Sequence, residues 1–99
     1  MAYTVEMSPK AEKELYKAWT WYEEEQPGLG DRFQMEFFRK IGLIQNNPLH
    51  YPLKKGLREA ITDTFPYLLV YKVSERQRMI LIVSVFHTSR HPKKKRQAS

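Results

Sequence analysis

Met79-Ile80-Leu81-Ile82-Val83-Ser84-Val85-Phe86 is a nearly uninterrupted apolar run that ends abruptly in the polar segment His87-Thr88-Ser89-Arg90-His91-Pro92. Its β-branched residues and short length predict a strand buried on both faces rather than a helix. Pro92 cannot donate to a strand ladder, so we expect the strand to end before it. Polar side chains that leave such a strand stand on a rigid support, which makes His87 and Arg90 the first candidates for function.

The composition predicts one compact domain. The chain has 99 residues, of which 41% are hydrophobic, and it has no cysteine, which excludes disulfides, thiolate metal ligands and thiol nucleophiles. No apolar run approaches the roughly 20 residues that span a bilayer, and residues 1–6 lack the features of a signal peptide. We therefore expect a cytoplasmic protein without membrane contact, with one domain over residues 1–92 and a basic tail over 93–99.

Positive charge is concentrated at the end of the chain. The formal net charge is +6, and Lys93-Lys94-Lys95-Arg96 alone supplies four positive charges. Such runs are usually solvated tails, and this one would add salt-dependent attraction to any nucleic acid nearby. The run supports an anionic partner without identifying it.

The order of apolar patterns predicts two helices followed by three strands. A short strand over residues 3–7 precedes a helix that begins at Ser8-Pro9, and a second helix runs from about Gly30 to Asn46. The expected inner faces of the helices consist of Ala11, Leu15, Ala18 and Tyr22 in the first and Phe33, Phe37, Ile41 and Ile44 in the second. Later strands are expected over residues 57–64, 67–73 and 79–86.

This order gives an α+β fold, β-α-α-β-β-β. The short turn at residues 26–30 predicts an antiparallel helical hairpin, and the short connections after residue 64 make the later strands antiparallel neighbours. We expect the hairpin to pack on one face of a three- to four-stranded antiparallel sheet. The acidic run Glu23-Glu24-Glu25 is interpreted as a solvated helix end, with pairing to a basic partner as the alternative.

Several short strings, taken in their order and spacing, resemble the RelE/ParE superfamily of toxins from type II toxin–antitoxin modules. They are Pro9-Lys10-Ala11-Glu12-Lys13-Glu14-Leu15, Trp21-Tyr22-Glu23-Glu24, Pro27-Gly28-Leu29-Gly30-Asp31-Arg32-Phe33, Asn47-Pro48, Tyr51-Pro52, Arg58-Glu59-Ala60, Phe65-Pro66-Tyr67 and Val85-Phe86-His87-Thr88-Ser89-Arg90. The Pro-Gly-Leu-Gly turn and the His-Thr-Ser-Arg ending look more like the ParE plasmid-stabilisation branch. His91 stands where relatives frequently carry aspartate, which is a departure from that pattern.

The resemblance implies a toxin that inhibits growth and is neutralised by a cognate antitoxin, in a complex that can be a hetero-oligomer. ParE-like members act on DNA gyrase, whereas RelE-like members enter the ribosome and cut mRNA. We interpret this chain as a gyrase-binding toxin. The alternatives are a ribosome-dependent mRNA endonuclease and a toxin fold without toxicity.

Four cations are the candidate target-binding residues. Lys54 and Lys55 precede the expected strand that carries Arg58, and Arg90 follows the last strand. Cations on neighbouring strands can converge on one patch and stabilise negative charge on a phosphate. By position, Arg58 and Arg90 correspond best to the basic residues of RelE-like nucleases. The same two residues would be catalytic if the protein cuts RNA.

A nuclease would also need a proton donor and acceptor. His87 is the candidate because an unperturbed histidine titrates near pH 6.5, and no tyrosine follows Phe86. A histidine at a strand end is more often structural, so binding is favoured over catalysis. We expect no cofactor and no metal, since His50, His87 and His91 lack a shared helix face and a placed carboxylate.

Three apolar residues are the candidate antitoxin-binding surface. Trp21, Met35 and Phe38 exceed what a domain of this size needs for its core. This hypothesis requires that the three side chains are exposed.

Overall fold

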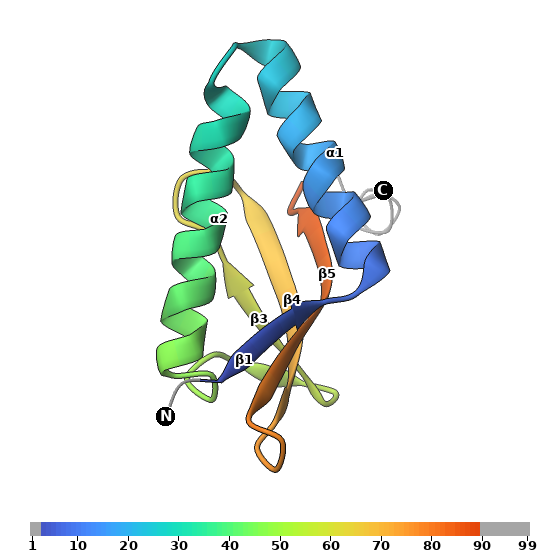
Figure 1. The fold of residues 1–99 in the computed structure, drawn as a ribbon, viewed down its shortest axis with the longest axis vertical. Coiled ribbons are helices and arrows are strands. Elements are labelled where there is room, and N and C mark those ends of the chain that lie inside the picture. Colours follow the sequence, from blue (N-terminus) through green and yellow to red (C-terminus); the bar gives the residue numbers. More distant parts are fainter. Residues whose placement is uncertain (1–2, 90–99) are drawn as a thin grey trace.

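The computed structural model describes residues 3–89 and forms two layers, a helical hairpin against a sheet (Figure 1). Along the chain, strand β1 (Thr4–Met7) is followed by helices α1 (Pro9–Glu25) and α2 (Leu29–Asn46). The remaining strands then follow: β2 (Leu53–Lys54), β3 (Leu57–Ile61), β4 (Tyr67–Ser74) and β5 (Met79–His87). The expected β-α-α-β-β-β order and the α+β class are confirmed. No helix within the described residues is long and apolar enough to cross a membrane.

The sheet has five strands in the order β1-β5-β4-β3-β2. The last three strands are antiparallel neighbours as expected, whereas β1 pairs in parallel with the first half of β5. A sheet of mixed direction arises because the helical hairpin carries the chain away from β1 and the later strands return to it from a distance. The two-residue strand β2 was not expected from the sequence.

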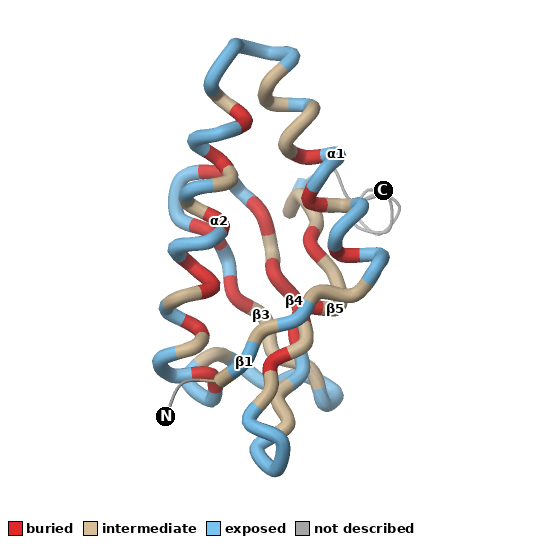
Figure 2. The backbone as a smooth tube through the Cα atoms, viewed as in Figure 1, coloured by how far each residue is buried: buried red, intermediate tan, exposed pale blue. Residues whose placement is uncertain are grey.

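The core lies between the hairpin and one face of the sheet (Figure 2). Phe33, Phe37 and Ile44 from α2 and Leu69 and Tyr71 from β4 are fully buried, as the apolar spacing predicts. Burial of these side chains stabilises the fold by roughly 1.5–3 kcal/mol each.

The prediction that β5 is buried on both faces is wrong. Ile80, Ile82 and Val85 are buried, but their neighbours Leu81 and Phe86 are only half-buried because the helices cover a single face of the sheet. The pairing register shifts between Val70 and Tyr71, where β5 has one additional residue. The continuous apolar run thus supplies the core from one face and an apolar open face from the other.

Glu23 joins the two helices at the tip of the hairpin. Its carboxylate accepts hydrogen bonds from the backbone N–H groups of Gly28 (2.8 Å) and Gly30 (3.0 Å), which satisfies donors at the start of α2. A Cβ on Gly30 would lie 2.6 Å from the Trp19 carbonyl oxygen, so only glycine lets the helices approach this closely. The interpretation of the acidic run as a wholly solvated helix end is therefore wrong for Glu23.

The second half of β5 is a sheet edge that α1 covers. Glu14 Oε1 accepts hydrogen bonds from the Val85 N–H (2.8 Å) and the Ser84 hydroxyl (3.0 Å), and Lys10 Nζ donates to Glu14 Oε2 and Ser84 Oγ, both at 3.1 Å. Polar side chains therefore occupy part of an edge to which another strand could pair.

Candidate functional site

The end of β5 holds His87 in a fixed hydrogen-bonded geometry. The imidazole lies edge-on to the Tyr67 ring, with ring centroids 5.3 Å apart, and its Nδ1 accepts a hydrogen bond from the Ser89 N–H at 3.1 Å. The Ser89 hydroxyl lies 3.1 Å from the same Nδ1, so local contacts hold the imidazole at the strand end. Arg90, His91 and the tail over 93–99 lie outside the described residues.

Arg58 and Tyr71 fasten the loop after α2 to the sheet. Arg58 Nη1 donates to the carbonyl oxygens of Tyr51 (2.8 Å) and Leu49 (3.3 Å), and the Tyr71 hydroxyl donates to the Pro48 carbonyl at 2.8 Å. Burial raises the pKa of Tyr71 to about 12, against the opposing effect of the Arg58 charge. The phenol therefore stays protonated at neutral pH and is not suited to act as a general base.

Lys54 and Lys55 are exposed where β2 turns into β3. Lys55 and Gly56 have φ values of 51° and 82°, as a tight two-residue hairpin turn requires. Lys54 Nζ lies 3.6 Å from Glu59 Oε1 in an exposed ion pair. The turn presents both ammonium groups to solvent.

His87 lies apart from Lys54, Lys55 and Arg58 in the sheet. Arg58 pairs with Tyr71, and Tyr71 pairs with Ile82. His87 lies five residues after Ile82 along β5, which corresponds to roughly 15 Å along the strand. Lys54 pairs with Leu57, beyond Arg58 in the direction away from His87. The convergence expected among Lys54, Lys55, Arg58 and Arg90 stays a prediction, because Arg90 lies outside the described residues.

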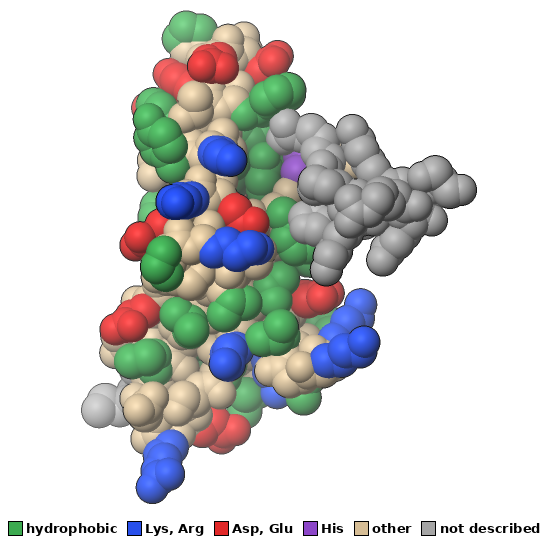
Figure 3. All heavy atoms as spheres, turned by 90° about the vertical axis from the view of Figure 1, so that its right-hand side faces the viewer, with side chains coloured by type: hydrophobic (Ala, Val, Ile, Leu, Met, Phe, Trp, Pro, Cys, Tyr) green, Lys and Arg blue, Asp and Glu red, His purple; other side chains and the backbone are tan. Residues whose placement is uncertain are grey.

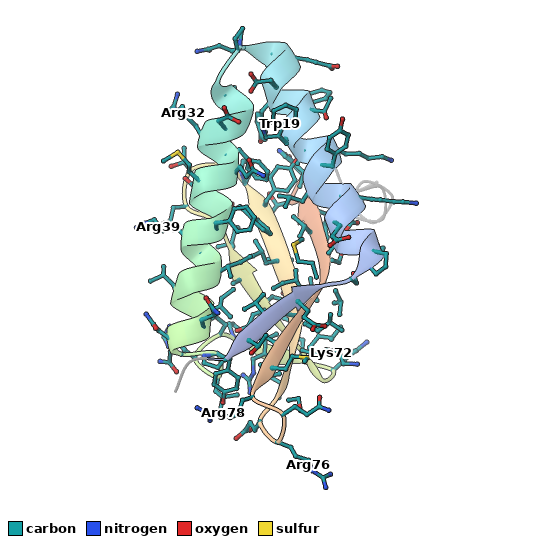
Figure 4. All side chains as sticks on the ribbon, viewed as in Figure 1. Trp19, Arg32, Arg39, Lys72, Arg76 and Arg78 are labelled. Atoms are coloured by element: carbon teal, nitrogen blue, oxygen red, sulfur yellow. The ribbon has the colours of Figure 1, made fainter. Side chains whose placement is uncertain are left out.

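Basic side chains instead gather at the end of the sheet away from His87. Lys72 and Arg76 are exposed there, and the Arg78 guanidinium stacks on the Tyr3 ring at 4.4 Å from its centroid (Figure 4). Seen from the side, basic side chains also stand out at this lower end of the molecule (Figure 3). Lys72, Arg76 and Arg78 lie within seven consecutive residues around the turn from β4 to β5, so their spacing was an available signal, and only the stacking on Tyr3 depends on the packing of distant segments.

A second candidate surface is a groove along the hairpin and β1, which we call the hairpin groove. It consists of three adjoining hollows of about 530, 460 and 740 Å³ that share lining residues. Its apolar lining comprises Val5, Met7, Leu15, Tyr16, Trp19, Met35, Phe38 and Ile41. In Figure 4, Trp19 lies between the two helices, and its indole N–H donates to Asp31 Oδ1 at 3.0 Å.

The three candidate antitoxin-binding residues are all exposed, but they do not share one surface. Met35 (73% exposed) and Phe38 (48%) line the hairpin groove. Trp21 (48%) lies on the opposite flank of α1, one turn after Lys17 and two turns after Glu14. That flank faces β5, as the Glu14 contacts require.

Tyr16 and Trp19 are groove residues that sequence reasoning missed. Tyr16 is 67% exposed, and its ring stacks on Trp19 with centroids 6.3 Å apart. The available signal was their spacing, since Glu12, Tyr16 and Trp19 follow one flank of α1 beside its core-facing residues.

The uncovered face of the sheet is a third, smaller apolar surface. Ile61 is 52% exposed, and Leu68 and Phe86 pair with each other on the same face.

Among the described residues, no group of three or more His, Cys, Asp or Glu side chains could hold a metal ion. The geometry of the described residues thus offers binding surfaces, with His87 and Tyr71 both engaged in structural contacts.

Comparison with known proteins agrees with this architecture. The fold resembles a toxin–antitoxin system ParDE of P. aeruginosa (TM-score 0.74, 14% identity, 86% of this chain and 95% of that chain). It also resembles chains of the intact E. coli RelBE complex (0.70, 20%, 90% and 100%) and of the M. tuberculosis RelBE2 complex (0.62, 22%, 90% and 94%). A comparison with curated protein sequences gave no significant match.

The family model for the ParE toxin of the type II toxin–antitoxin system parDE matches residues 5–92, which include every described helix and strand except the first residue of β1. The chain therefore belongs to the ParE toxin family of type II toxin–antitoxin systems.

Proposed function

We propose that this toxin inhibits growth by binding DNA gyrase and that a cognate antitoxin neutralises it. The observation that carries the proposal is the ParE family match over residues 5–92, because the sequence resemblance implies gyrase as the target of ParE-like members. The similar folds include a ParDE system and RelBE complexes, which supports an antitoxin as the partner of this chain.

The contacts of His87, the candidate for proton transfer, and of the buried Tyr71 phenol support binding over RNA cleavage. His87 Nδ1 accepts the Ser89 N–H, and Tyr71 holds its proton against the Pro48 carbonyl. Proton transfer by positioned side chains typically contributes about 10²–10⁴-fold to catalysis, whereas the contacts of both groups within the described residues are structural. These contacts favour a toxin that acts by occupying its target.

For the target-binding surface we propose Lys54, Lys55, Arg58 and Arg90, with distinct roles. Lys54 and Lys55 present exposed charge to the target, whereas Arg58 supports the loop beside them through its two carbonyl contacts. Arg90 follows the end of β5. The basic run over 93–96 adds nonspecific attraction and does not position the target.

The experiment compares two purified systems. We expect the wild-type chain to inhibit DNA supercoiling by gyrase, or to stabilise cleaved DNA, and to leave ribosome-bound mRNA intact. Lys54→Ala/Lys55→Ala and Arg90→Ala should each lose inhibition, whereas the matched variant Lys13→Ala/Lys17→Ala on α1 should retain it. Codon-position-specific mRNA cuts that disappear in His87→Ala would overturn the proposal in favour of a nuclease.

A growth assay tests the module itself. Expression of the chain alone should slow growth, and co-expression of the antitoxin encoded by the adjacent gene should restore it. Undiminished growth at well-detected levels of folded protein would contradict toxicity and leave a toxin fold without this activity.

A further inference from the structure

The hairpin groove is acidic although the protein is basic. Glu6, Glu12 and Asp31 line its two hollows beside β1 and α1, and no Lys or Arg among residues 3–89 lines either hollow. Arg39 lines only the third hollow, and its guanidinium is paired with Asp63 at 3.2 Å. The groove therefore combines an apolar floor with negative charge on a chain whose formal net charge is +6.

Two of these carboxylates are available to a partner. Glu6 and Glu12 are exposed, and their carboxylates have no hydrogen bond or ion pair with any residue that the structure describes. Asp31 accepts the Trp19 indole N–H through one oxygen, which leaves its second oxygen without a described partner. Uncompensated carboxylates beside apolar side chains favour a ligand that brings both apolar surface and positive charge.

The free edge of β1 indicates that this ligand is a polypeptide. Thr4 N–H donates to the Arg78 carbonyl and Ser8 N–H donates to the Ile82 carbonyl, so the main-chain groups of even-numbered residues point towards β5. Those of Val5 and Met7 consequently point away from β5, and both residues line a hollow together with Phe38 and Ile41. Edge groups that have no partner among residues 3–89, next to an apolar hollow, suit an extended segment of another chain.

We propose that the hairpin groove selects a basic segment of the antitoxin, one whose apolar residues cover Met35 and Phe38 and whose lysine or arginine side chains meet Glu6, Glu12 and Asp31. This inference rests on the proposed neutralisation by an antitoxin. It adds the chemistry of the segment and its place on the toxin. The acidic groove separates this partner from the target, which the proposed cationic surface would contact.

Crosslinking identifies the segment directly. Because the chain has no cysteine, Gln34→Cys places one thiol in the groove for a photoactivated maleimide crosslinker, and Lys13→Cys places one on the other flank of α1 as control. The probe is the antitoxin encoded by the adjacent gene. Mass spectrometry of the Gln34→Cys product should give an antitoxin peptide with lysine or arginine close to the crosslink. An acidic or uncharged peptide there, or efficient crosslinking from Lys13→Cys alone, would overturn the inference.

Charge removal provides an independent test. Glu6→Gln/Glu12→Gln should slow association with the antitoxin by about three- to tenfold at low ionic strength, with the difference disappearing at high salt. Glu24→Gln/Glu25→Gln removes the same charge from the exposed end of α1 and should leave association unchanged. Equal rates for the two double variants would contradict the inference.

Different results would contradict the proposed function and the inference about the hairpin groove. The Glu6→Gln/Glu12→Gln variant should still inhibit growth, because the proposed target surface lies elsewhere. If the wild-type chain neither inhibits growth nor binds the adjacent gene product at any ionic strength, the proposed function has failed as well. If it does both and only the charge variants behave like their controls, the inference alone is wrong.

Discussion

Phe37 and Phe38 are consecutive residues of α2 with opposite environments. Phe37 is completely buried against the sheet, whereas Phe38 is 48% exposed and lines the hairpin groove. Their rings are 5.2 Å apart and almost perpendicular, so the outer ring rests on the inner one. The comparison separates the inner side of the hairpin, which stabilises the fold, from its outer side, which is free to bind.

Truncation of the two rings should have different consequences. Phe37→Ala should lower the free energy of unfolding by about 3–5 kcal/mol, because it removes a buried ring and leaves a cavity. Phe38→Ala should cost less than about 1 kcal/mol yet weaken antitoxin binding by roughly tenfold or more. Urea denaturation and calorimetric titration measure the two effects. Similar losses of stability in both variants would remove the distinction between the two sides.

Two glycines of α2 sharpen the comparison. Gly30→Ala should destabilise by about 1–3 kcal/mol, since its Cβ would meet the Trp19 carbonyl and force the helices apart. A Cβ at Gly42 meets nothing within 4 Å, so Gly42→Ala should stabilise the helix by up to about 1 kcal/mol. Thermal denaturation of both variants checks the opposite signs. Equal shifts in one direction would show that close packing at the hairpin tip is not needed.

The ion pairs of Arg39 and Lys40 with Asp63 should have the smallest effect on stability. Both pair with Asp63, at 3.2 and 3.5 Å, although Arg39 is exposed and Lys40 is buried. The hydrogen bond from Arg39, followed by the charge of Lys40, lowers the pKa of Asp63 below its ordinary value of 3.8. A lowered folded-state pKa stabilises the protein above that ordinary value, and the contribution is lost as the pH falls through the folded-state value.

Asp63→Asn should therefore flatten the loss of stability on acidification below about pH 4. The difference from wild type should be slight, because Asp63 is exposed and solvent screens the pairs. Urea midpoints at neutral pH and at several acidic values provide the measurement. Parallel pH profiles for the two proteins would show that these ion pairs contribute nothing measurable.

The helices show how much a local pattern can predict. The spacing of eight residues identified the inner faces. Seven of them are buried, namely Ala11, Leu15, Ala18, Phe33, Phe37, Ile41 and Ile44, and the eighth, Tyr22, is half-buried against the core. The same pattern could not distinguish the two outer flanks of α1. Tyr16 and Trp19 line the groove and Trp21 does not, because the placement of α2 and β5 on either side of the helix decides which flank becomes a groove.

The candidate site shows the limit of positional reasoning. Lys54, Lys55 and Arg58 are close in sequence, but the two lysines are exposed at a turn while Arg58 reaches the carbonyls of Leu49 and Tyr51. His87 was recognised as the end of the last strand, yet its distance from these residues depends on a register that the sequence does not reveal. Pairing between distant strands, unlike helical periodicity, is a property of the assembled sheet.

The sequence by itself determined the element order, the helical hairpin, the helical inner faces and the resemblance to ParE toxins, because these depend on local spacing and short strings. The tertiary structure decided the parallel pairing of β1 with β5, the contact of Glu23 with the start of α2, and the covering of the β5 edge by Glu14. It also decided that Glu6, Glu12 and Asp31 meet in one groove. These features join residues that are distant in the chain, and their geometry exists only once the hairpin has packed on the sheet.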